Sequence, residues 1–280
     1  MLVLEKGIVL ANPLEYPTLL YSAPGVGKTT LASQIPGHYF LLTEAGDQGL
    51  AVRGSPIMEW ISGREIDYKG EKRGPIGFLD HCAEIVTAKE NGWKVDGVEI
   101  PPIKVIVIDT IENLYEMCAR HICDTTEFVG DGGAQKYKFV EDVSYGRGYK
   151  RVNRLLLEKL QKLVLHGFGL VLISHVKERQ VKWKGQKIDY SGPNLPPSAA
   201  EEIVGFCGVV GYMFIEASET KKDEELIRRE VARWVCFQPQ VEHVAKHRLT
   251  GFPERFIIPD EHSGWALYTQ KFEETLRARN

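Results

Sequence analysis

The sequence predicts an α/β fold with a mostly parallel central sheet, flanking helices, and antiparallel strands toward the C-terminal side. Three observations predict this fold. Residues 16–31 join a short apolar strand to a glycine-bearing loop and the start of a helix. Residues 105–109 place four β-branched residues before an aspartate, which is typical of a strand covered on both faces. An amphipathic helix at 152–166 then leads to another apolar strand at 169–173.

Length and composition indicate a single domain over residues 1–280. The chain has 280 residues and 43% hydrophobic content, enough for one large core. It contains no run of about 18 apolar residues, and an acidic residue follows the N-terminus too early for a secretory signal. We therefore expect a cytoplasmic protein with no membrane partner. The formal charge of -3 argues against a uniformly basic nucleic-acid coat, so binding to nucleic acid would require a local patch.

The cysteines predict neither a disulfide framework nor a zinc site. Their number is odd, and no two of them form a C-x-x-C pair. We expect all five to be reduced packing residues: Cys82, Cys118, Cys123, Cys207 and Cys236.

The segment from residue 22 to residue 30 is interpreted as a phosphate-binding loop for ATP. Small residues allow backbone N–H groups to turn inward around phosphate oxygens. Lys28 would reach the β- and γ-phosphates, and Thr29 would place its hydroxyl on Mg²⁺. Ser22 stands where the first glycine of the motif is usual, but a serine can still make the tight turn. The residues expected around the nucleotide are Ser22, Ala23, Pro24, Gly25, Val26, Gly27, Lys28, Thr29 and Thr30.

Two carboxylates follow predicted strands at the edge where open α/β sheets bind ligands. Glu44 follows the apolar strand 39–42 and is the candidate general base for the attacking water. Capping of the next turn is the alternative role for Glu44, and Asp47 is the weaker competitor as base. Asp109, at the end of the 105–109 strand, would hold Mg²⁺ directly or through water.

The remaining elements of the first half are expected in the following order. An edge strand is predicted within 1–12, a helix at 28–35, a short strand at 57–61, a helix at 78–91 and an irregular or hairpin segment at 93–102. A helix should run from Asp109 to about Cys123, and the polar, glycine-bearing stretch 124–148 is expected to be mobile.

A basic patch follows the polar pair Ser174-His175 at the end of the 169–173 strand. His175 could sense the γ-phosphate, or it could cap the strand for structural reasons. A β-hairpin with its turn at Lys184-Gly185 is predicted next, and an exposed hairpin with no ligand is its alternative role. Basic side chains can bind phosphates, and an indole can stack on an unpaired base. The candidate DNA-binding residues are Arg147, Lys177, Arg179, Lys182, Trp183, Lys184 and Lys187.

The C-terminal part is predicted to be a helix at 197–207 and strands at 209–216, 233–238 and 241–246. The charged run 218–230 is interpreted as a solvated connection between strands. A Lys246-x-Arg248 pair closes the last strand, and it is either an ordinary surface pair or a functional one. A short helix is expected at 268–279.

The order of these motifs resembles the RecA-like ATPase core shared by RecA recombinases, DnaB-type helicases and KaiC. Within it, the sequences SAPGVGKTT, VIVIDT, YGRGY, LISH and AKHRLTGFPE are most similar to compact phage-encoded ATP-binding proteins, several of which are annealing or recombination ATPases. The similarity covers about residues 14–259. The resemblance implies a RecA-like P-loop NTPase fold, Glu44 as the catalytic carboxylate, and DNA-binding loops after Asp109 and His175. It also implies that Lys246 and Arg248 act in trans on the nucleotide of a neighbouring subunit. RecA-type proteins usually carry a glutamine where His175 stands.

The function expected from this resemblance is that of a Mg²⁺-dependent ATP hydrolase that binds single-stranded DNA and promotes annealing or recombination. It would assemble head to tail with itself as a ring or filament, and a single-strand DNA-binding protein is a further candidate partner. The implied setting is a phage protein in the cytoplasm of a bacterial host. Two other functions stay open: a helicase motor or loader, and a KaiC-like regulatory switch without nucleic acid.

Overall fold

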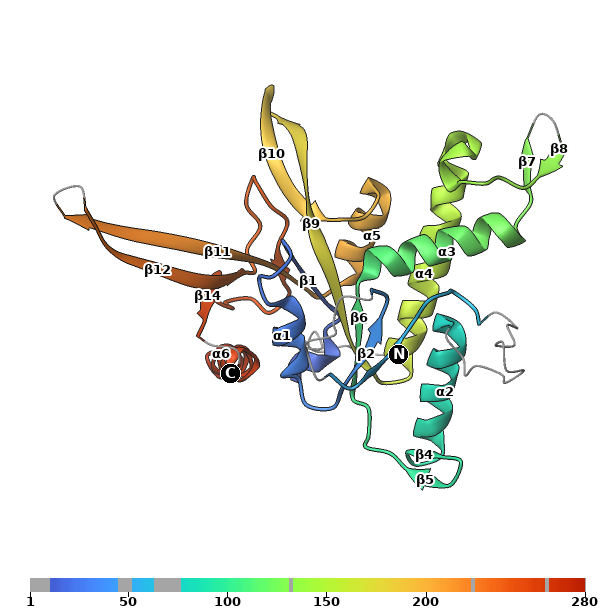
Figure 1. Ribbon diagram of the computed structural model, residues 1–280, viewed down its shortest axis with the longest axis horizontal. Helices are drawn as coiled ribbons and strands as arrows, with labels where there is room; N and C mark the ends of the chain where they lie inside the picture. The colour runs from blue at the N-terminus through green and yellow to red at the C-terminus, as the bar shows by residue number, and fades with distance from the viewer. Residues whose placement is uncertain are drawn as a thin grey trace, which may run out of the picture.

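The chain builds one large sheet with helices on both of its faces, as Figure 1 shows. The computed structural model describes residues 11–44, 52–62, 77–130, 133–222, 225–259 and 262–279, without the side chains of residues 130, 183, 218–222 and 225–230. The helices are α1 (Lys28–Ser33), α2 (Phe78–Glu90), α3 (Ile111–Thr125), α4 (Arg147–Leu165), α5 (Pro197–Phe206) and α6 (Gly264–Arg277), with 3-10 turns η1 (Pro13–Glu15), η2 (Val140–Asp142) and η3 (Ser144–Gly146). The strands are β1 (Thr18–Ser22), β2 (His38–Leu42), β3 (Gly54–Pro56), β4 (Lys94–Val95), β5 (Val98–Glu99), β6 (Val105–Asp109), β7 (Phe128–Gly130), β8 (Gly133–Gln135), β9 (Gly169–Trp183), β10 (Gln186–Pro193), β11 (Val209–Lys222), β12 (Glu225–Cys236), β13 (Lys246–His247) and β14 (Arg255–Ile258).

The strand order confirms the predicted α/β fold with a mostly parallel central sheet. Within the described part of the chain, ten strands form the main sheet, in the order β14-β12-β11-β1-β9-β6-β2-β3, with β10 paired to β9 and β13 paired to β11. The pairs from β11 through β3 are parallel, whereas β12, β14, β10 and β13 pair antiparallel. Strand β9 therefore lies between β1 and β6. Strands β1 and β6 end beside residues 173–175 of β9, which continues past this edge of the sheet to Trp183.

The two faces of the sheet bury separate apolar clusters. One cluster packs α1 and α6 against the sheet and includes Leu31 and Phe272. The other packs α2, α3, α4 and α5 against the opposite face and includes Leu114 and Leu156. Every residue of β6 is buried, because β6 is covered on both faces, as its β-branched sequence predicts. Among the described residues, no helix is long and apolar enough to cross a membrane. All five cysteines are free and buried, in agreement with the sequence prediction.

Two long hairpins project from the body of the molecule in Figure 1. One is β9–β10, in which Trp183 pairs with Gln186 around the predicted turn at Lys184-Gly185. The other is β11–β12, which occupies most of the 218–230 run, so the prediction of a solvated connection there was wrong. The run is rich in charged residues, and it therefore lacks the apolar alternation that indicates a strand.

Several other boundaries differ from the sequence prediction. The strand expected at 57–61 is instead β3, at Gly54–Pro56, and the strand expected at 241–246 is reduced to β13. The stretch 124–148 contains β7, β8, η2 and η3, and α4 begins at Arg147 rather than at residue 152. The C-terminal helix begins at Gly264, earlier than expected. The edge strand expected within 1–12 falls almost wholly outside the described residues.

Candidate active site

The phosphate loop joins β1 to α1 at the carboxyl end of the sheet. Gly25 (φ 78°) and Gly27 (φ 107°) adopt left-handed backbone conformations, which glycine tolerates because it has no Cβ. The buried Lys28 side chain folds over the loop, and its Nζ donates to Ser22 Oγ at 3.1 Å and to the Ala23 carbonyl at 3.3 Å. Ser22 Oγ donates in turn to the Ala23 carbonyl at 2.7 Å. The serine in place of glycine is therefore accommodated because its hydroxyl group is satisfied within the loop.

The first side chain of α1 after the lysine meets the carboxylate at the end of β6. Thr29 Oγ1 donates to Asp109 Oδ2 at 2.7 Å, and Asp109 is buried. The two oxygen atoms lie side by side at the carboxyl end of the sheet, and oxygen atoms are the ligands that Mg²⁺ takes. The arrangement fits the metal role expected for Thr29 and Asp109.

Glu44 is held in position by the beginning of α3. Its Oε1 accepts hydrogen bonds from Thr110 Oγ1 at 3.0 Å and from Asn113 Nδ2 at 3.1 Å. Thr43 and Thr110 also exchange two hydrogen bonds, which fasten the end of β2 to the end of β6. The competing carboxylate, Asp47, lies outside the described residues. Glu44 is therefore a half-buried, oriented carboxylate at the ligand edge of the sheet.

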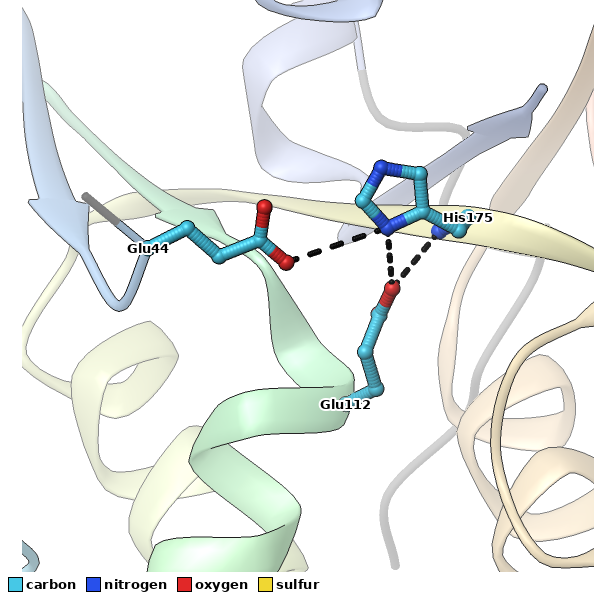
Figure 2. A group of neighbouring side chains, drawn as sticks. All are labelled: Glu44, Glu112 and His175. Carbon is cyan, nitrogen blue, oxygen red and sulfur yellow. Dashed lines mark hydrogen bonds and ion pairs between the residues drawn. The ribbon is translucent and has the colours of Figure 1, made fainter. Parts of the chain in front are cut away.

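His175 lies between two carboxylates, as Figure 2 shows. Glu112 Oε1 accepts from both the backbone N–H and the Nδ1 of His175, each at 2.8 Å. Glu44 Oε1 is 3.8 Å from the same Nδ1. Because a carboxylate oxygen accepts, Nδ1 carries the proton. The three ligand atoms lie within 4.8 Å of one another, close enough for a divalent cation, but the Glu112–His175 hydrogen bond satisfies that pair without one.

Sequence reasoning missed three residues of this cluster: Thr110, Glu112 and Asn113. All three follow Asp109 directly, in the first turn of α3. Their signal is the position of polar residues in a helix that begins at the ligand edge of the sheet. The buried side chain of Glu112 is the clearest case, because a buried carboxylate requires a partner. The identity of that partner, His175, depends on how β9 pairs with β6.

The family of the protein follows from a comparison of its sequence with known domains. The profile of the AAA domain family matches residues 15–249, which include every residue of the candidate site described above. The chain belongs to the AAA domain family. This AAA domain protein is a P-loop ATPase. Among solved structures it is similar to a KaiC-like protein from the hyperthermophilic archaeon Pyrococcus horikoshii OT3, with 14% sequence identity, a TM-score of 0.38, and coverage of 89% of this chain and 88% of that chain. A search of the curated proteins found no match.

The AAA domain places Lys246 and Arg248 at the opposite end of the sheet from its own phosphate loop. Lys246 pairs with Val210 near the start of β11, beside the start of β1. Lys246 Nζ donates to the Val204 carbonyl at 2.6 Å, and Arg248 donates to the Gly205 carbonyl at 3.5 Å, at the C-terminal end of α5. Burial, with the nearby Arg248 charge, lowers the pKa of Lys246. The fold does not bring this pair to the active site of the same chain.

The candidate DNA-binding residues of the AAA domain are spread along β9 and β10. Lys177, Lys182, Lys184 and Lys187 are exposed, whereas Arg179 is half-buried and donates to the Leu195 carbonyl. The side chain of Trp183 lies outside the described part of the structure. Arg147 opens α4 and donates to the carbonyls of Val129 (2.7 Å) and Ser144 (3.3 Å). These contacts give Arg147 a structural role in holding β7.

A cavity of about 800 Å³ lies beside the Glu112–His175 pair. It is bounded by α3, η2, the start of α4 and the base of the β9–β10 hairpin. Its lining includes the cations Lys177 and Arg179, the aromatic residues Phe139 and Tyr149, and Glu112. One wall residue of the cavity is thus also a hydrogen-bond partner of His175 at the active site.

Proposed function

We propose that this ATPase is Mg²⁺-dependent, binds single-stranded DNA, and promotes annealing or recombination as a head-to-tail oligomer. The observation that carries the proposal is the position of His175 within β9. His175 contacts the active-site carboxylates, and the same strand continues through Lys177 and Arg179 to the tip of a basic hairpin. A conformational change at the nucleotide would thus be transmitted to a basic surface along one continuous strand.

Each active-site residue has a role in the proposed reaction. Lys28 binds the β- and γ-phosphates, and Thr29 and Asp109 hold Mg²⁺, which neutralises charge on the phosphates. Glu44 orients or deprotonates the attacking water. The hydrogen bonds from Thr110 and Asn113 fix the position of the Glu44 carboxylate. Because Nδ1 of His175 donates to Glu112, Nε2 is the ring atom assigned to sense the γ-phosphate.

Charge and shape support the base of the β9–β10 hairpin as the DNA site. The 800 Å³ cavity is large enough for a nucleotide, since ligand pockets range from about 300 to 1,000 Å³. Lys177 and Arg179 supply positive charge for a phosphate, and the half-exposed Phe139 ring offers a face for an unpaired base. Glu112 separates the cavity from His175, so occupancy of the cavity can alter the contact between Glu112 and the active site.

The head-to-tail assembly rests on Arg248. This residue is exposed and cannot serve its own nucleotide, because the phosphate loop lies at the other end of the sheet. Its contact with the Gly205 carbonyl, at 3.5 Å, is at the outer limit of a hydrogen bond, whereas Lys246 is firmly bonded at 2.6 Å. In a heterologous contact between subunits, opposite ends of neighbouring chains can meet. Arg248 is therefore the candidate arginine finger, and Lys246 positions it.

A DNA-stimulated ATPase assay tests the proposal. ATP turnover should rise when single-stranded oligonucleotide is added, and double-stranded competitor should not reproduce the rise. ATP turnover indifferent to DNA would favour a regulatory switch instead. ATP-driven separation of a duplex, in place of annealing of complementary strands, would favour a helicase motor or loader.

Variants of the β9–β10 hairpin test where the DNA binds. Replacing Lys177, at the base of the hairpin, and Lys182 by alanine should weaken binding and reduce the salt dependence of log affinity by about 0.7 for each phosphate that is no longer neutralised. Trp183→Ala should weaken binding with little change in this slope, because stacking releases no counterions. Replacing Arg277 and Arg279 on the C-terminal side of α6 removes the same charge and should leave the slope unchanged. Wild-type affinity in all the hairpin variants would contradict a DNA site on this hairpin.

A further inference from the structure

Arg233 lies in β12, on the same face of the sheet as the phosphate-loop helix α1. It pairs with Ile215 in β11 and with Ile258 in β14. Side chains alternate along a strand, so Arg233 shares a face with Val235, two residues further on. Val235 is buried in the apolar cluster that contains Val26 of the loop and several residues of α1. The half-buried Arg233 side chain is thus directed toward the α1 side of the sheet.

Arg233 approaches the phosphate loop at Gly27. A Cβ atom placed on Gly27 would be 4.0 Å from Cδ of Arg233, which is ordinary van der Waals contact. The last methylene group of Arg233 therefore lies close to the space beside the Gly27 backbone, next to Lys28, and the guanidinium group is bonded to this methylene. The sequence contains no sign of this approach, because β12 lies far from the loop along the chain.

The charges around the loop indicate which role the guanidinium group of Arg233 has there. Lys28 is the cation within the motif, and a lysine at this position reaches the β- and γ-phosphates. Lys246 and Arg248 lie at the other end of the sheet. Backbone N–H groups of the loop surround the α- and β-phosphates, and Arg233 approaches the loop at one of these backbone positions. A guanidinium also offers several donors in a planar fork that suits phosphate oxygens.

We propose that Arg233 completes the nucleotide site within its own chain by binding the α- and β-phosphates of the nucleotide. The proposal deepens the assignment of the loop to ATP and rests on it. Because ADP also carries the α- and β-phosphates, Arg233 should stabilise ADP and ATP to a similar extent. It would act on nucleotide affinity, whereas an arginine finger acts on the rate of γ-phosphate transfer. The base of the β11–β12 hairpin would thereby form one wall of the nucleotide site.

Equilibrium binding of ATP and ADP to the full chain tests this role. Arg233→Gln should weaken both nucleotides about tenfold to a hundredfold, which is the range for loss of charge-assisted hydrogen bonds. KM for ATP should rise by a similar factor, with a smaller change in kcat. Arg233→Lys should lose less affinity than Arg233→Gln, because the charge is retained and only the fork is removed. The glutamine and lysine variants together keep the test valid if one of them folds poorly.

The matched control is Arg255→Gln in the adjacent strand β14. Arg255 pairs with Cys236 and lies over the Trp234 ring, on the face of the sheet opposite to Arg233. This variant should bind both nucleotides as the wild type does. Wild-type affinity of a folded Arg233→Gln for both nucleotides would overturn the proposal, and so would a loss confined to kcat. If Lys28→Ala weakens binding while Arg233→Gln does not, the loop assignment survives and only the role of Arg233 fails. If the wild type binds neither nucleotide, the loop assignment fails first.

Discussion

The two ends of the central sheet both carry charged side chains, but these are satisfied in different ways. At the carboxyl end, side chains from separate elements bond to one another: Thr29 to Asp109, and Glu112 to His175. At the amino end, Lys246 bonds to main-chain carbonyls at the end of α5. Helix C-termini leave carbonyl groups without intrahelical partners, and cations stabilise them. The first arrangement is suited to a ligand, and the second stabilises the fold of its own chain.

The residue between the two cations at the amino end shows the same contrast. His247 stacks on Phe252 with ring centroids 3.8 Å apart, and its Nε2 lies 3.1 Å from Tyr268 Oη. Burial lowers the pKa of His247 to about 4. His175, at the carboxyl end, instead bonds to carboxylates and is partly exposed. His247 is thus packed among aromatic rings, whereas His175 belongs to the candidate site, and this difference decides what each mutation should do.

The largest expected effect is at Arg248, where a role in capping α5 and a role as an arginine finger predict different activities. If Arg248 only caps α5, its loss should cost a little stability and no activity. If it is an arginine finger for a neighbouring subunit, Arg248→Ala should lower kcat by about 10³- to 10⁵-fold while ATP still binds. Specific ATPase activity should also rise with protein concentration, since the active site is shared. Steady-state kinetics over a range of protein concentrations measure both effects.

Mixing two inactive variants separates the arginine finger from the helix cap. Arg248→Ala keeps an intact phosphate loop, and Lys28→Ala keeps an intact finger, so the mixture should regain part of the activity. Arg255→Ala serves as the control for loss of an exposed arginine. Full activity in a strictly monomeric preparation, or an inactive mixture of folded variants that co-assemble, would show that Arg248 does not act in trans.

The next largest effect is expected at Glu44, at the carboxyl end of the sheet. Glu44→Gln keeps the size of the side chain and its acceptor for Thr110 and Asn113, but removes the base. Turnover should fall by about 10²- to 10⁴-fold, the usual contribution of a general base, with ATP affinity retained. Single-turnover hydrolysis and equilibrium binding measure the two quantities. Hydrolysis at the wild-type rate would exclude Glu44 from the mechanism.

The smallest effect concerns stability and the amino end. The pKa of His247 is about 4 in the folded chain and about 6.5 in the unfolded chain, so only the unfolded chain binds the proton between these values. Stability should therefore fall as the pH falls from about 6.5 through about 4, by up to about 3 kcal/mol from this residue. His247→Gln removes this proton uptake and should flatten the pH dependence of the free energy of unfolding. Denaturant titrations at pH 7 and pH 4.5 measure the change.

The exposed His166 provides the control for this experiment. His166→Gln removes an exposed imidazole by the same substitution and should reproduce the wild-type pH dependence. If His247→Gln retains the full pH dependence of the wild type, the loss of stability arises from other buried groups. The lowered pKa of His247 would then not account for the pH dependence of stability.

The candidate site was predictable from the sequence wherever one short segment specifies the geometry. The loop 22–30, the buried strand that ends at Asp109 and the turn at Lys184-Gly185 are such segments. The position of Glu44 at a strand end was also predictable, because parallel strands share one ligand edge. The hydrogen-bond partners in the site were not predictable from the sequence. Glu112 contacts His175 only because β9 pairs with β6. Pairing between distant strands depends on contacts that no local pattern encodes.

Local backbone preferences and apolar periodicity specify the phosphate loop, the parallel core and the order of its main elements, so these features were predictable from the sequence. Only the tertiary structure decided that Arg233 lies beside Gly27 and that Lys246 and Arg248 lie at the opposite end of the sheet. It also decided that the charged run 218–230 belongs to a projecting hairpin. Strand pairing across the sheet decides which residues become neighbours in each case, and no local sequence pattern encodes that pairing.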